Sequence, residues 1–336
     1  MITRRNISLK PFNTFGIDVR AAYFHEIAQV EDIREALRGT RPFLILGGGS
    51  NILFTEDFKG SILHNQILGK KVIYETEKHV IVDIGSGENW HEAVKWCLSK
   101  GFGGLENLSL IPGTVGAAPI QNIGAYGVEL KETFQSLEAL LIENLSVKTF
   151  DNSDCGFQYR DSIFKRGLKD KIFILNIRLK LTKKDHRLNT TYTSLYQRLE
   201  SENLLRTSDP NVISKAVIAI REEKLPNPKV IGNAGSFFKN PVIPISHLKQ
   251  LKARFPGIIY YPQGEEHVKL AAGWLIEACG WKGKQIGQAG CHQNQALVLV
   301  NHGNASGKEI YDLSRMIQNS IADTFEVSLE PEVNIF

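Results

Sequence analysis

A polar loop follows the apolar run 43–46 and has the composition of a phosphate-binding loop. It consists of Gly47, Gly48, Gly49, Ser50 and Asn51. Glycine lets backbone N–H groups approach a pyrophosphate without a Cβ clash, and the Ser and Asn side chains add hydrogen-bond donors. The loop matches neither G-x-G-x-x-G nor G-x-x-x-x-G-K-[ST], so neither a Rossmann fingerprint nor a Walker loop is indicated. On these residues alone, a phosphate-binding loop and a plain strand-ending turn both stay open.

An uncharged stretch, residues 109–127, is the second candidate for ligand contact. Its sequence is Ser-Leu-Ile-Pro-Gly-Thr-Val-Gly-Ala-Ala-Pro-Ile-Gln-Asn-Ile-Gly-Ala-Tyr-Gly. Because most of these side chains are small, the backbone can lie against a large flat ligand. The alternative is a tightly packed crossover that touches no ligand.

Three further positions carry residue types that could act on a substrate. Arg160 precedes Asp161. Its guanidinium can form a surface ion pair, or it can bind a carboxylate through two parallel hydrogen bonds. Ser236 follows Ala-Gly and precedes two phenylalanines, which is not the G-x-S-x-G pattern, so a hydrolase is disfavoured and a turn serine is the alternative. Glu332 belongs to a Glu-Pro-Glu sequence, for which a solvated terminus is the alternative.

The composition excludes several classes of protein. The 336 residues carry 40 Lys and Arg against 36 Asp and Glu, a formal net charge of +4 without any block of like charge, which argues against nucleic-acid binding. No apolar window spans a bilayer and no signal-peptide core follows the first residues, so we expect a cytoplasmic protein. The four cysteines form no Cys-x-x-Cys pair and the nine histidines form no H-E-x-x-H pattern, so we expect reduced thiols and no metal site.

Helices and strands alternate in the pattern that must position these residues. We expect a helix over 31–38, a strand over 43–46, a helix over 89–100 capped by Asn89, and an alternating, half-buried strand over 173–181. Further helices are expected from Pro210, over 246–255, 270–279 and 306–325, with closing strands at 327–329 and 333–335. The polar composition of residues 182–204 predicts a domain junction there.

Together these segments resemble the UDP-N-acetylenolpyruvoylglucosamine reductase family, flavoenzymes of peptidoglycan precursor synthesis. The matching blocks are residues 13–16, 47–53, 111–130, 159–165, 224–241, 271–295 and 329–333. They occur in this order over essentially the whole chain, which makes the resemblance specific. Residues 261–263 and 271–287 resemble the longer subtype, in which a tyrosine loop covers the substrate.

The resemblance implies an α+β fold of the vanillyl-alcohol-oxidase (PCMH) type. Two subdomains, residues 1–68 joined by the C-terminal strand 327–336 and residues 69–205, would bind FAD without a covalent link. Residues 206–326 would form a separate substrate domain. The FAD contacts it implies are Gly47, Gly48, Gly49, Ser50, Asn51, Pro112, Gly113, Thr114, Gly116, Asn122, Gly124, Ala125, Tyr126 and Gly127.

The resemblance also implies the residues that act on the substrate. Arg160 and Glu332 would stabilise negative charge on the enolpyruvyl carboxylate, and Ser236 would donate a proton. The substrate contacts it implies are Tyr192, Lys224, Asn240, Tyr261 and Gln295. No metal ligand is implied.

The implied reaction is the reduction of UDP-N-acetylglucosamine enolpyruvate to UDP-N-acetylmuramate, with NADPH as co-substrate. The implied partners are therefore a nucleotide sugar and NADPH, and we expect a monomer that inserts into no membrane. Two other hypotheses stay open. One is an FAD-dependent oxidase of a sugar or hydroxy acid on the same fold, and the other is a non-catalytic protein that binds a nucleotide sugar.

Overall fold

The computed structural model describes residues 1–39 and 42–336, and these form two compact units. Unit 1 consists of Met1–Ile7, Ala21–Gly48 and Lys59–Glu223. Unit 2 consists of Ser8–Arg20, Gly49–Phe58 and Lys224–Phe336. The glycine loop is thus shared, with Gly47 and Gly48 in unit 1 and Gly49 in unit 2. The three predicted domain ranges stay predictions.

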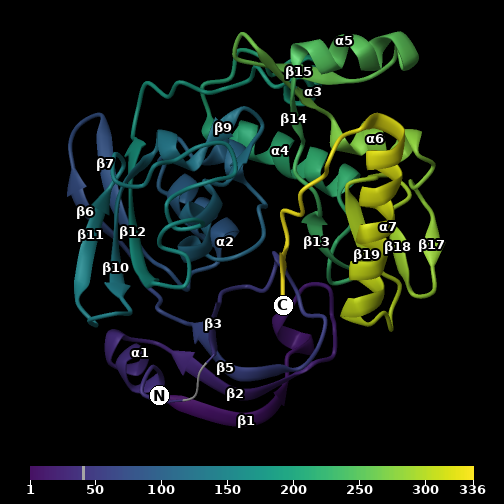
Figure 1. The fold of residues 1–336 in the computed structure, drawn as a ribbon. Helices are drawn as coiled ribbons and strands as arrows, with labels where there is room; N and C mark the ends of the chain where they lie inside the picture. Colours follow the sequence, from purple (N-terminus) through teal and green to yellow (C-terminus); the bar gives the residue numbers. More distant parts are fainter. Residues whose placement is uncertain (40–41) are drawn as a thin grey trace. The chain divides into compact units, whose positions relative to one another are not determined.

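The first sheet of unit 1 has the strand order β1-β2-β5-β3 (Figure 1). Its strands are β1 (Ile2–Ser8), β2 (Arg20–Ile27), β3 (Phe43–Leu46) and β5 (Phe58–Asn65), with α1 (Val30–Ala36) between β2 and β3 in the chain. β3 and β5 run parallel, and a buried apolar cluster joins Ile27, Ile33 and Leu63. The predicted strand 43–46 is confirmed, and it ends where the glycine loop begins.

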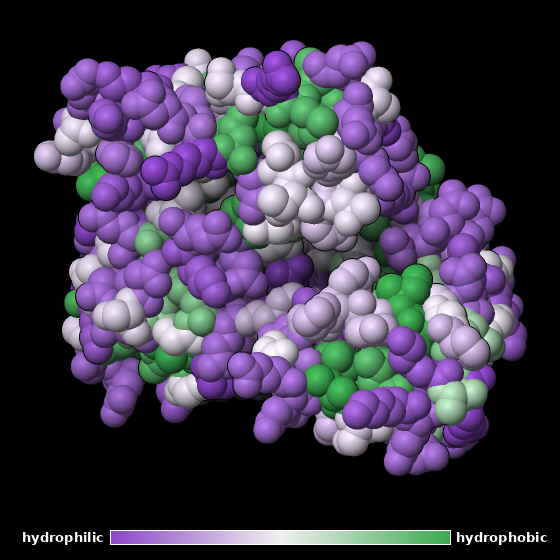
Figure 2. Space-filling view, turned by 90° about the horizontal axis from the view of Figure 1, so that it is seen from above, coloured by the Kyte–Doolittle hydropathy of each residue, from purple (hydrophilic) through white to green (hydrophobic). Residues whose placement is uncertain are grey.

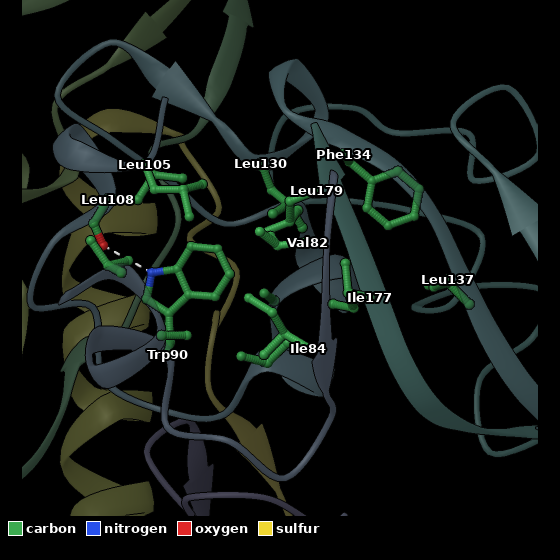
Figure 3. Packing of buried hydrophobic residues seen from close by; sticks show 14 of the residues in the cluster. Val82, Ile84, Trp90, Leu105, Leu108, Leu130, Phe134, Leu137, Ile177 and Leu179 are labelled. Atoms are coloured by element: carbon green, nitrogen blue, oxygen red, sulfur yellow. Dashed lines mark hydrogen bonds between the residues drawn. The ribbon is translucent and has the colours of Figure 1, made fainter. Parts of the chain in front are cut away.

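The second sheet of unit 1 is antiparallel, with the order β11-β10-β12-β7-β6. Its strands are β6 (Lys70–Glu75), β7 (His79–Gly85), β10 (Phe134–Leu141), β11 (Val147–Asp151) and β12 (Ile172–Thr182). The helix α2 (Trp90–Ser99) contributes Trp90 to the core beside this sheet, where its indole N–H donates to the Leu108 carbonyl at 2.9 Å (Figure 3). The predicted Asn89 cap is confirmed, since its side chain accepts from the Glu92 N–H at 3.0 Å.

The prediction of a regular, half-buried β12 is wrong for its first half. Ile172 and Ile174 are buried as well as Phe173 and Leu175. The register against β10 shifts at Leu175, which is a β-bulge. Because of this bulge Phe173 and Leu175 face one apolar cluster, whereas Ile177 and the alternate residues after it face another.

Short elements and two helices complete unit 1. They are the 3₁₀ helices η2 (Glu106–Leu108), η3 (Val115–Gln121) and η4 (Leu130–Glu132), the strands β8 (Gly124–Ala125) and β9 (Val128–Glu129), and the helices α3 (Thr193–Ser201) and α4 (Pro210–Lys224). Pro210 opens α4, as predicted. The uncharged stretch 109–127 is therefore folded into η3 and β8.

Unit 2 contains two small sheets, with the orders β13-β19-β18-β17 and β14-β16-β15. Its elements are η1 (Lys10–Phe12), β4 (Ile52–Leu53), β13 (Gly232–Ser236), β14 (Val242–Pro244), α5 (Ile245–Arg254), β15 (Tyr260–Gln263), β16 (His267–Leu270), α6 (Ala272–Ala278), β17 (Gln285–Ile286), β18 (Ala289–Cys291), β19 (Val298–Asn301), α7 (Gly307–Phe325) and β20 (Asn334–Ile335). α7 lies against β18 and β19 (Figure 1). The predicted start of α7 is confirmed by a capping box between Ser306 and Glu309.

Three predicted boundaries in unit 2 are wrong. α5 begins at Ile245, one residue before the expected helix over 246–255, because Pro244 takes the N-cap position. Leu270 ends β16 instead of opening α6. Residues 327–329 form no strand, although Val327 and Leu329 are buried. The prediction failed because a short buried apolar segment has the same sequence pattern as a strand.

The surface has no large apolar area on the face drawn in Figure 2, where hydrophobic residues form small groups among hydrophilic ones. In the part of the chain that the structure describes, no helix is long and apolar enough to cross a membrane. Within that same part, no three His, Cys, Asp or Glu side chains are grouped as metal ligands.

Candidate active site

The glycine loop offers a row of backbone donors that the protein itself does not use. The N–H groups of Gly47, Gly48, Gly49 and Ser50 donate to no acceptor among residues 1–39 and 42–336. Nearly all buried backbone N–H groups in folded proteins have a partner, and Gly49 is buried. Consecutive free amides of this kind form a concave site for an anion.

The structure brings this loop against the second predicted segment within unit 1. A Cβ on Gly47 would lie 2.4 Å from Thr114 Oγ1, and a Cβ on Gly48 would lie 3.2 Å from Gly113 Cα. The N–H groups of Gly113 and Thr114 also find no acceptor in the described part of the chain. Two stretches some 65 residues apart in sequence thus combine their unused donors, and only glycine permits this approach.

The backbone of the second segment is fixed by the strand end and helix start beside it. The Trp90 N–H donates to the Gly113 carbonyl at 3.0 Å, and the Gly116 N–H donates to the Ser86 carbonyl at 2.8 Å. A Cβ on Gly116 would lie 2.7 Å from the Ser86 Cβ. Pro112 and Ala125 lie in the same segment, Pro112 exposed and Ala125 packed on the core.

Asn122 holds this segment in shape from a fully buried position. Its φ is +44°, and its amide donates to Glu129 Oε2 at 3.0 Å and to the Gln158 carbonyl at 3.1 Å. Its Oδ1 accepts from the Lys131 N–H at 3.0 Å. With these contacts made inside the protein, the side chain of Asn122 positions the segment, and its predicted contact with FAD stays a prediction.

Arg160 lies against the end of the same segment. Its Nη2 donates to the Gly124 carbonyl at 2.6 Å, and a Cβ on Gly124 would lie 2.9 Å from Nη1. Arg160 has a φ of +54°, and its guanidinium lies 5.3 Å from the centre of the Tyr159 ring. Asp161, its neighbour in sequence, pairs with Arg166 at 3.0 Å.

Tyr126 and Tyr192, predicted for FAD and substrate respectively, meet in unit 1. Their rings are 5.3 Å apart in an edge-to-face arrangement. Tyr126 has a φ of +50°, and its carbonyl accepts from the Asn107 amide at 2.9 Å. The carbonyl of Gly127 accepts from Asn189 at 3.0 Å. Burial raises the pKa of Tyr126 above its usual value, and the charge of Arg221 opposes this shift.

Ser236 and Glu332, 96 residues apart, are brought together in unit 2. Ser236 ends β13, paired with Val298, and its hydroxyl makes no hydrogen bond to any residue that the structure describes. The Glu332 N–H donates to the carbonyl of Phe237, the residue after Ser236, at 2.8 Å. Asn51 donates to the Glu332 carbonyl at 3.2 Å, so the last residue of the glycine loop also belongs to this group.

The predicted substrate residues of unit 2 divide into two sets. Asn240 and Gln295 meet at the start of α6, where Asn240 Oδ1 accepts from the Ala272 N–H at 2.9 Å and Gln295 Oε1 lies 3.6 Å from the Cβ position of Gly273. Tyr261 lies exposed on β15, and Lys224 lies exposed at the end of α4. No described contact joins these last two residues to Ser236.

Two residues that lie beside the candidate site were not predicted from the sequence. Arg221, on α4, is influenced by the charges of Tyr126 and Arg160, and burial lowers its pKa below the usual range. His91 accepts from the Leu110 N–H at 2.9 Å, which fixes the start of the uncharged segment. Arg221 follows Val217 by four residues and so lies on the apolar face of the helix. This spacing is the sequence signal from which its burial could have been predicted.

The donors and glycines described above fit a diphosphate, the anionic part of FAD. The comparison with known sequences points the same way. Residues 21–147 match a sequence profile described as "FAD binding domain". Residues 226–336 match one described as "UDP-N-acetylenolpyruvoylglucosamine reductase, C-terminal domain".

Full-length relatives and solved structures agree with these profiles. The UDP-N-acetylenolpyruvoylglucosamine reductase of Flavobacterium johnsoniae is 47% identical over 100% of both chains. That of Pseudomonas aeruginosa is 48% identical and covers 99% of this chain and 98% of its own length. The crystal structure of the reductase (MurB) from Thermus caldophilus has a TM-score of 0.67 at 22% identity, over 100% of both chains. A solvent-stable cholesterol oxidase has a TM-score of 0.50 at 10% identity, over 99% of this chain and 86% of its own.

These likenesses confirm the expected fold, an α+β fold of the vanillyl-alcohol-oxidase type. Identity at this level over the whole length also settles the family. The chain belongs to the UDP-N-acetylenolpyruvoylglucosamine reductase family, as the order of its motifs predicts.

Proposed function

We propose that this chain reduces UDP-N-acetylenolpyruvoylglucosamine to UDP-N-acetylmuramate in peptidoglycan precursor synthesis, with NADPH as electron donor and FAD as cofactor. Membership of the family supports the reaction. The observation that carries the assignment of residues is the pairing of the Glu332 backbone with that of Phe237 at 2.8 Å. This pairing supports the proposal that Glu332 acts beside Ser236, the proposed proton donor.

The free amides of the glycine loop and of Gly113 and Thr114 would hold the FAD diphosphate. When bound there, FAD would supply the hydride-transfer chemistry that links NADPH to the β-carbon of the enolpyruvyl group. Backbone N–H groups suit a diphosphate because they point fixed partial positive charge at it without a side chain that must be ordered.

Arg160 makes the enolpyruvyl ether able to accept a hydride. An enol ether that carries a carboxylate resists hydride addition unless the charge that develops on the α-carbon and carboxylate is stabilised. Arg160 provides a fixed cation for this charge, because its backbone and its bond to the Gly124 carbonyl hold the guanidinium in place. Glu332, in its protonated form, hydrogen-bonds the same carboxylate.

Ser236 completes the reaction by donating a proton to the α-carbon. Its hydroxyl is bound to no described residue, so its proton is available to the substrate. A carbanionic enol is basic enough to take a proton from an un-ionised hydroxyl, so Ser236 acts as a general acid and needs no lowered pKa. The product gains a hydride at the β-carbon and a proton at the α-carbon, and NADPH leaves as NADP⁺.

The remaining predicted residues would bind the nucleotide sugar. Lys224 suits the diphosphate because it is an exposed cation. Asn240 and Gln295 both lie at the start of α6, and Tyr192 and Tyr261 offer exposed rings. A cytoplasmic monomer is also part of the proposal, which cell fractionation and sedimentation of the purified protein test.

The decisive experiment follows the flavin under anaerobic conditions. The purified protein is reduced with NADPH, mixed with the enolpyruvyl nucleotide sugar, and its flavin absorbance and products are recorded. We expect reoxidation and a product with two more hydrogen atoms than the substrate. Reoxidation by dioxygen but not by the enolpyruvyl compound would identify an oxidase. A colourless protein that only binds nucleotide sugars would be a binding protein, and either result overturns the proposal.

A further inference from the structure

Arg221 projects from α4 toward the segments that form the candidate site in unit 1. Ser214, Val217 and Arg221 are spaced three and four apart, so they share one face of the helix. Ser214 Oγ lies 2.7 Å from Ser109 Oγ, and Val217 belongs to the apolar cluster that contacts Tyr126. The face that carries Arg221 therefore meets the uncharged segment at its start and near its end.

Arg221 is a partly exposed residue whose guanidinium has a buried Nε without the partner that such a donor needs. Its Nε is inaccessible to solvent and donates to no acceptor in residues 1–39 and 42–336, and no carboxylate there pairs with it. Arg198, in the same unit, differs from Arg221 because it forms ion pairs with both Glu202 and Glu223. A cation with a buried, unpaired donor and no counter-charge adds no stability to a fold, so stability does not explain why Arg221 is there.

Arg221 also lies within electrostatic range of Arg160, and the positive charge of Arg160 disfavours the charged form of Arg221. Two guanidinium groups within electrostatic range repel each other, and an anion between them relieves this repulsion. His91 and Tyr126 are the other titratable groups that interact with Arg221, and neither supplies a negative charge at neutral pH. A ligand anion is therefore the counter-charge that suits this place.

We propose that Arg221 is a substrate-binding residue that, beside Arg160, holds the enolpyruvyl carboxylate. The inference rests on the proposed function, because that function places the carboxylate at Arg160. A guanidinium is suited to this role since it is planar, always charged and able to donate two parallel hydrogen bonds. With two cations, the carboxylate can accumulate charge during hydride transfer without help from water.

The test measures ligand binding rather than turnover. Oxidised holoenzyme is titrated with the enolpyruvyl nucleotide sugar and, separately, with UDP-N-acetylglucosamine, which lacks the carboxylate, while the flavin spectrum and competition are followed. The variants are Arg221→Met, Arg221→Lys and, as a matched control, Lys215→Met, which removes an exposed cation from the same helix.

We expect Arg221→Met to weaken binding of the enolpyruvyl compound about 10- to 100-fold, as for loss of a charged hydrogen bond. Arg221→Lys should lose less, Lys215→Met should change nothing, and none should alter binding of UDP-N-acetylglucosamine. Equal losses for both ligands would show that Arg221 binds the diphosphate, and unchanged binding would show that it binds neither. Either result overturns the inference.

Thermal unfolding of the substrate-free holoenzyme separates this role from a structural one. Because removing an unpaired buried cation relieves repulsion, Arg221→Met should melt at the same temperature as the wild type or above it. A lower melting temperature with unchanged ligand binding would make Arg221 a structural residue and overturn the inference. If the wild-type protein itself fails to bind the enolpyruvyl compound, the proposed function fails instead.

Discussion

The Arg160 region of unit 1 and the Ser236 region of unit 2 are built in different ways. In unit 2, antiparallel hydrogen bonds join the backbones near Ser236 and Glu332, and the register irregularity before Ser236 contains a glycine, Gly235, with a φ of +70°. In unit 1, Asn122, Tyr126 and Arg160 all have φ between +44° and +54°. Non-glycine residues in this conformation cost about 1–2 kcal/mol each and persist only where their surroundings fix them. The chemistry of unit 2 should therefore be separable from its folding, and that of unit 1 should not.

The largest effect should come from removing the proposed proton donor of unit 2, Ser236. Ser236→Ala should slow reoxidation of the reduced enzyme by substrate about 10²–10⁴-fold, since general acid catalysis contributes that much. Reduction by NADPH and the melting temperature should stay at wild-type values, because the hydroxyl makes no hydrogen bond within the described chain. Stopped-flow flavin absorbance measures both half-reactions.

A serine from the same unit serves as control for this prediction. Ser246→Ala changes an exposed serine on α5 and should leave both half-reactions as they are. If Ser236→Ala slowed the two half-reactions equally, Ser236 would act on the cofactor site rather than as an acid, and the comparison between the units would fail.

Within unit 2, tight backbone contacts rather than site side chains should govern stability. Gly49 has a φ of +61°, and a Cβ there would lie 1.9 Å from the Phe12 carbonyl oxygen. Gly49→Ala should lower the free energy of unfolding by about 2–5 kcal/mol, from the left-handed conformation and the overpacking together. Denaturant unfolding measures this change.

Gly280→Ala isolates the conformational part of that effect. Gly280 has a φ of +73°, with open space at its Cβ position. The variant should therefore lose only about 1–2 kcal/mol. Equal losses for the two variants would mean that the contact with Phe12 contributes nothing.

In unit 1 a site-segment side chain should affect folding and binding together. Asn122→Asp keeps the acceptor for the Lys131 N–H but turns the amide donor into an oxygen beside Glu129 Oε2 and the Gln158 carbonyl. We expect a loss of about 1–3 kcal/mol at pH 7, from unsatisfied buried groups, and weaker FAD retention.

The pH dependence of this variant gives a second readout. Burial and Glu129 would raise the pKa of the new carboxyl in the folded state, so the ionisation penalty is full above that pKa and decreases as the pH falls from it toward the unfolded pKa, about 3.9. Asn144→Asp, an exposed position where only Oδ1 is used, should show neither effect. A stable Asn122→Asp protein that retains its full complement of FAD would contradict the view that unit 1 couples folding to binding.

The sequence was sufficient wherever one local rule decides the structure. Asn89 caps α2 and Pro210 opens α4 because capping and the fixed φ of proline act over one turn. Ser236 and Glu332 could be named from their motifs. Their contact through Phe237 could not be derived from periodicity, because it joins segments 96 residues apart.

The failures occur where tertiary packing overrides a local pattern. The bulge at Leu175 could not be predicted from the alternation of apolar and polar residues in β12. A bulge exchanges the two faces of the strand without any change in residue type. Arg221 was missed because Arg-Glu-Glu-Lys at a helix end has the composition of a solvated surface. Its buried Nε depends on which elements cover α4, which no single-sequence rule gives.

The smallest expected effect concerns the reactivity of the cysteine thiols, which allows the interiors of the two units to be compared. Burial raises the pKa of Cys97 and of Cys155 in unit 1 to about 12, and that of Cys291 in unit 2 to about 11. Cys279 alone among the four described cysteines is partly exposed. At pH 8 Ellman's reagent should therefore label one thiol quickly in the native protein, and Cys279→Ala should abolish that phase.

The same raised pKa values predict how stability changes in alkali. A thiol whose pKa is higher in the folded state stabilises the fold fully below its unfolded pKa, near 9, and this contribution is lost as the pH rises toward 12. Unfolding midpoints should thus fall above pH 9, and less steeply in a Cys97→Ala variant, although that variant starts lower because it leaves a small cavity. Rapid labelling of Cys97 or Cys155 at pH 8 would show instead that the core of unit 1 opens readily, which contradicts the rigidity inferred for the Arg160 region.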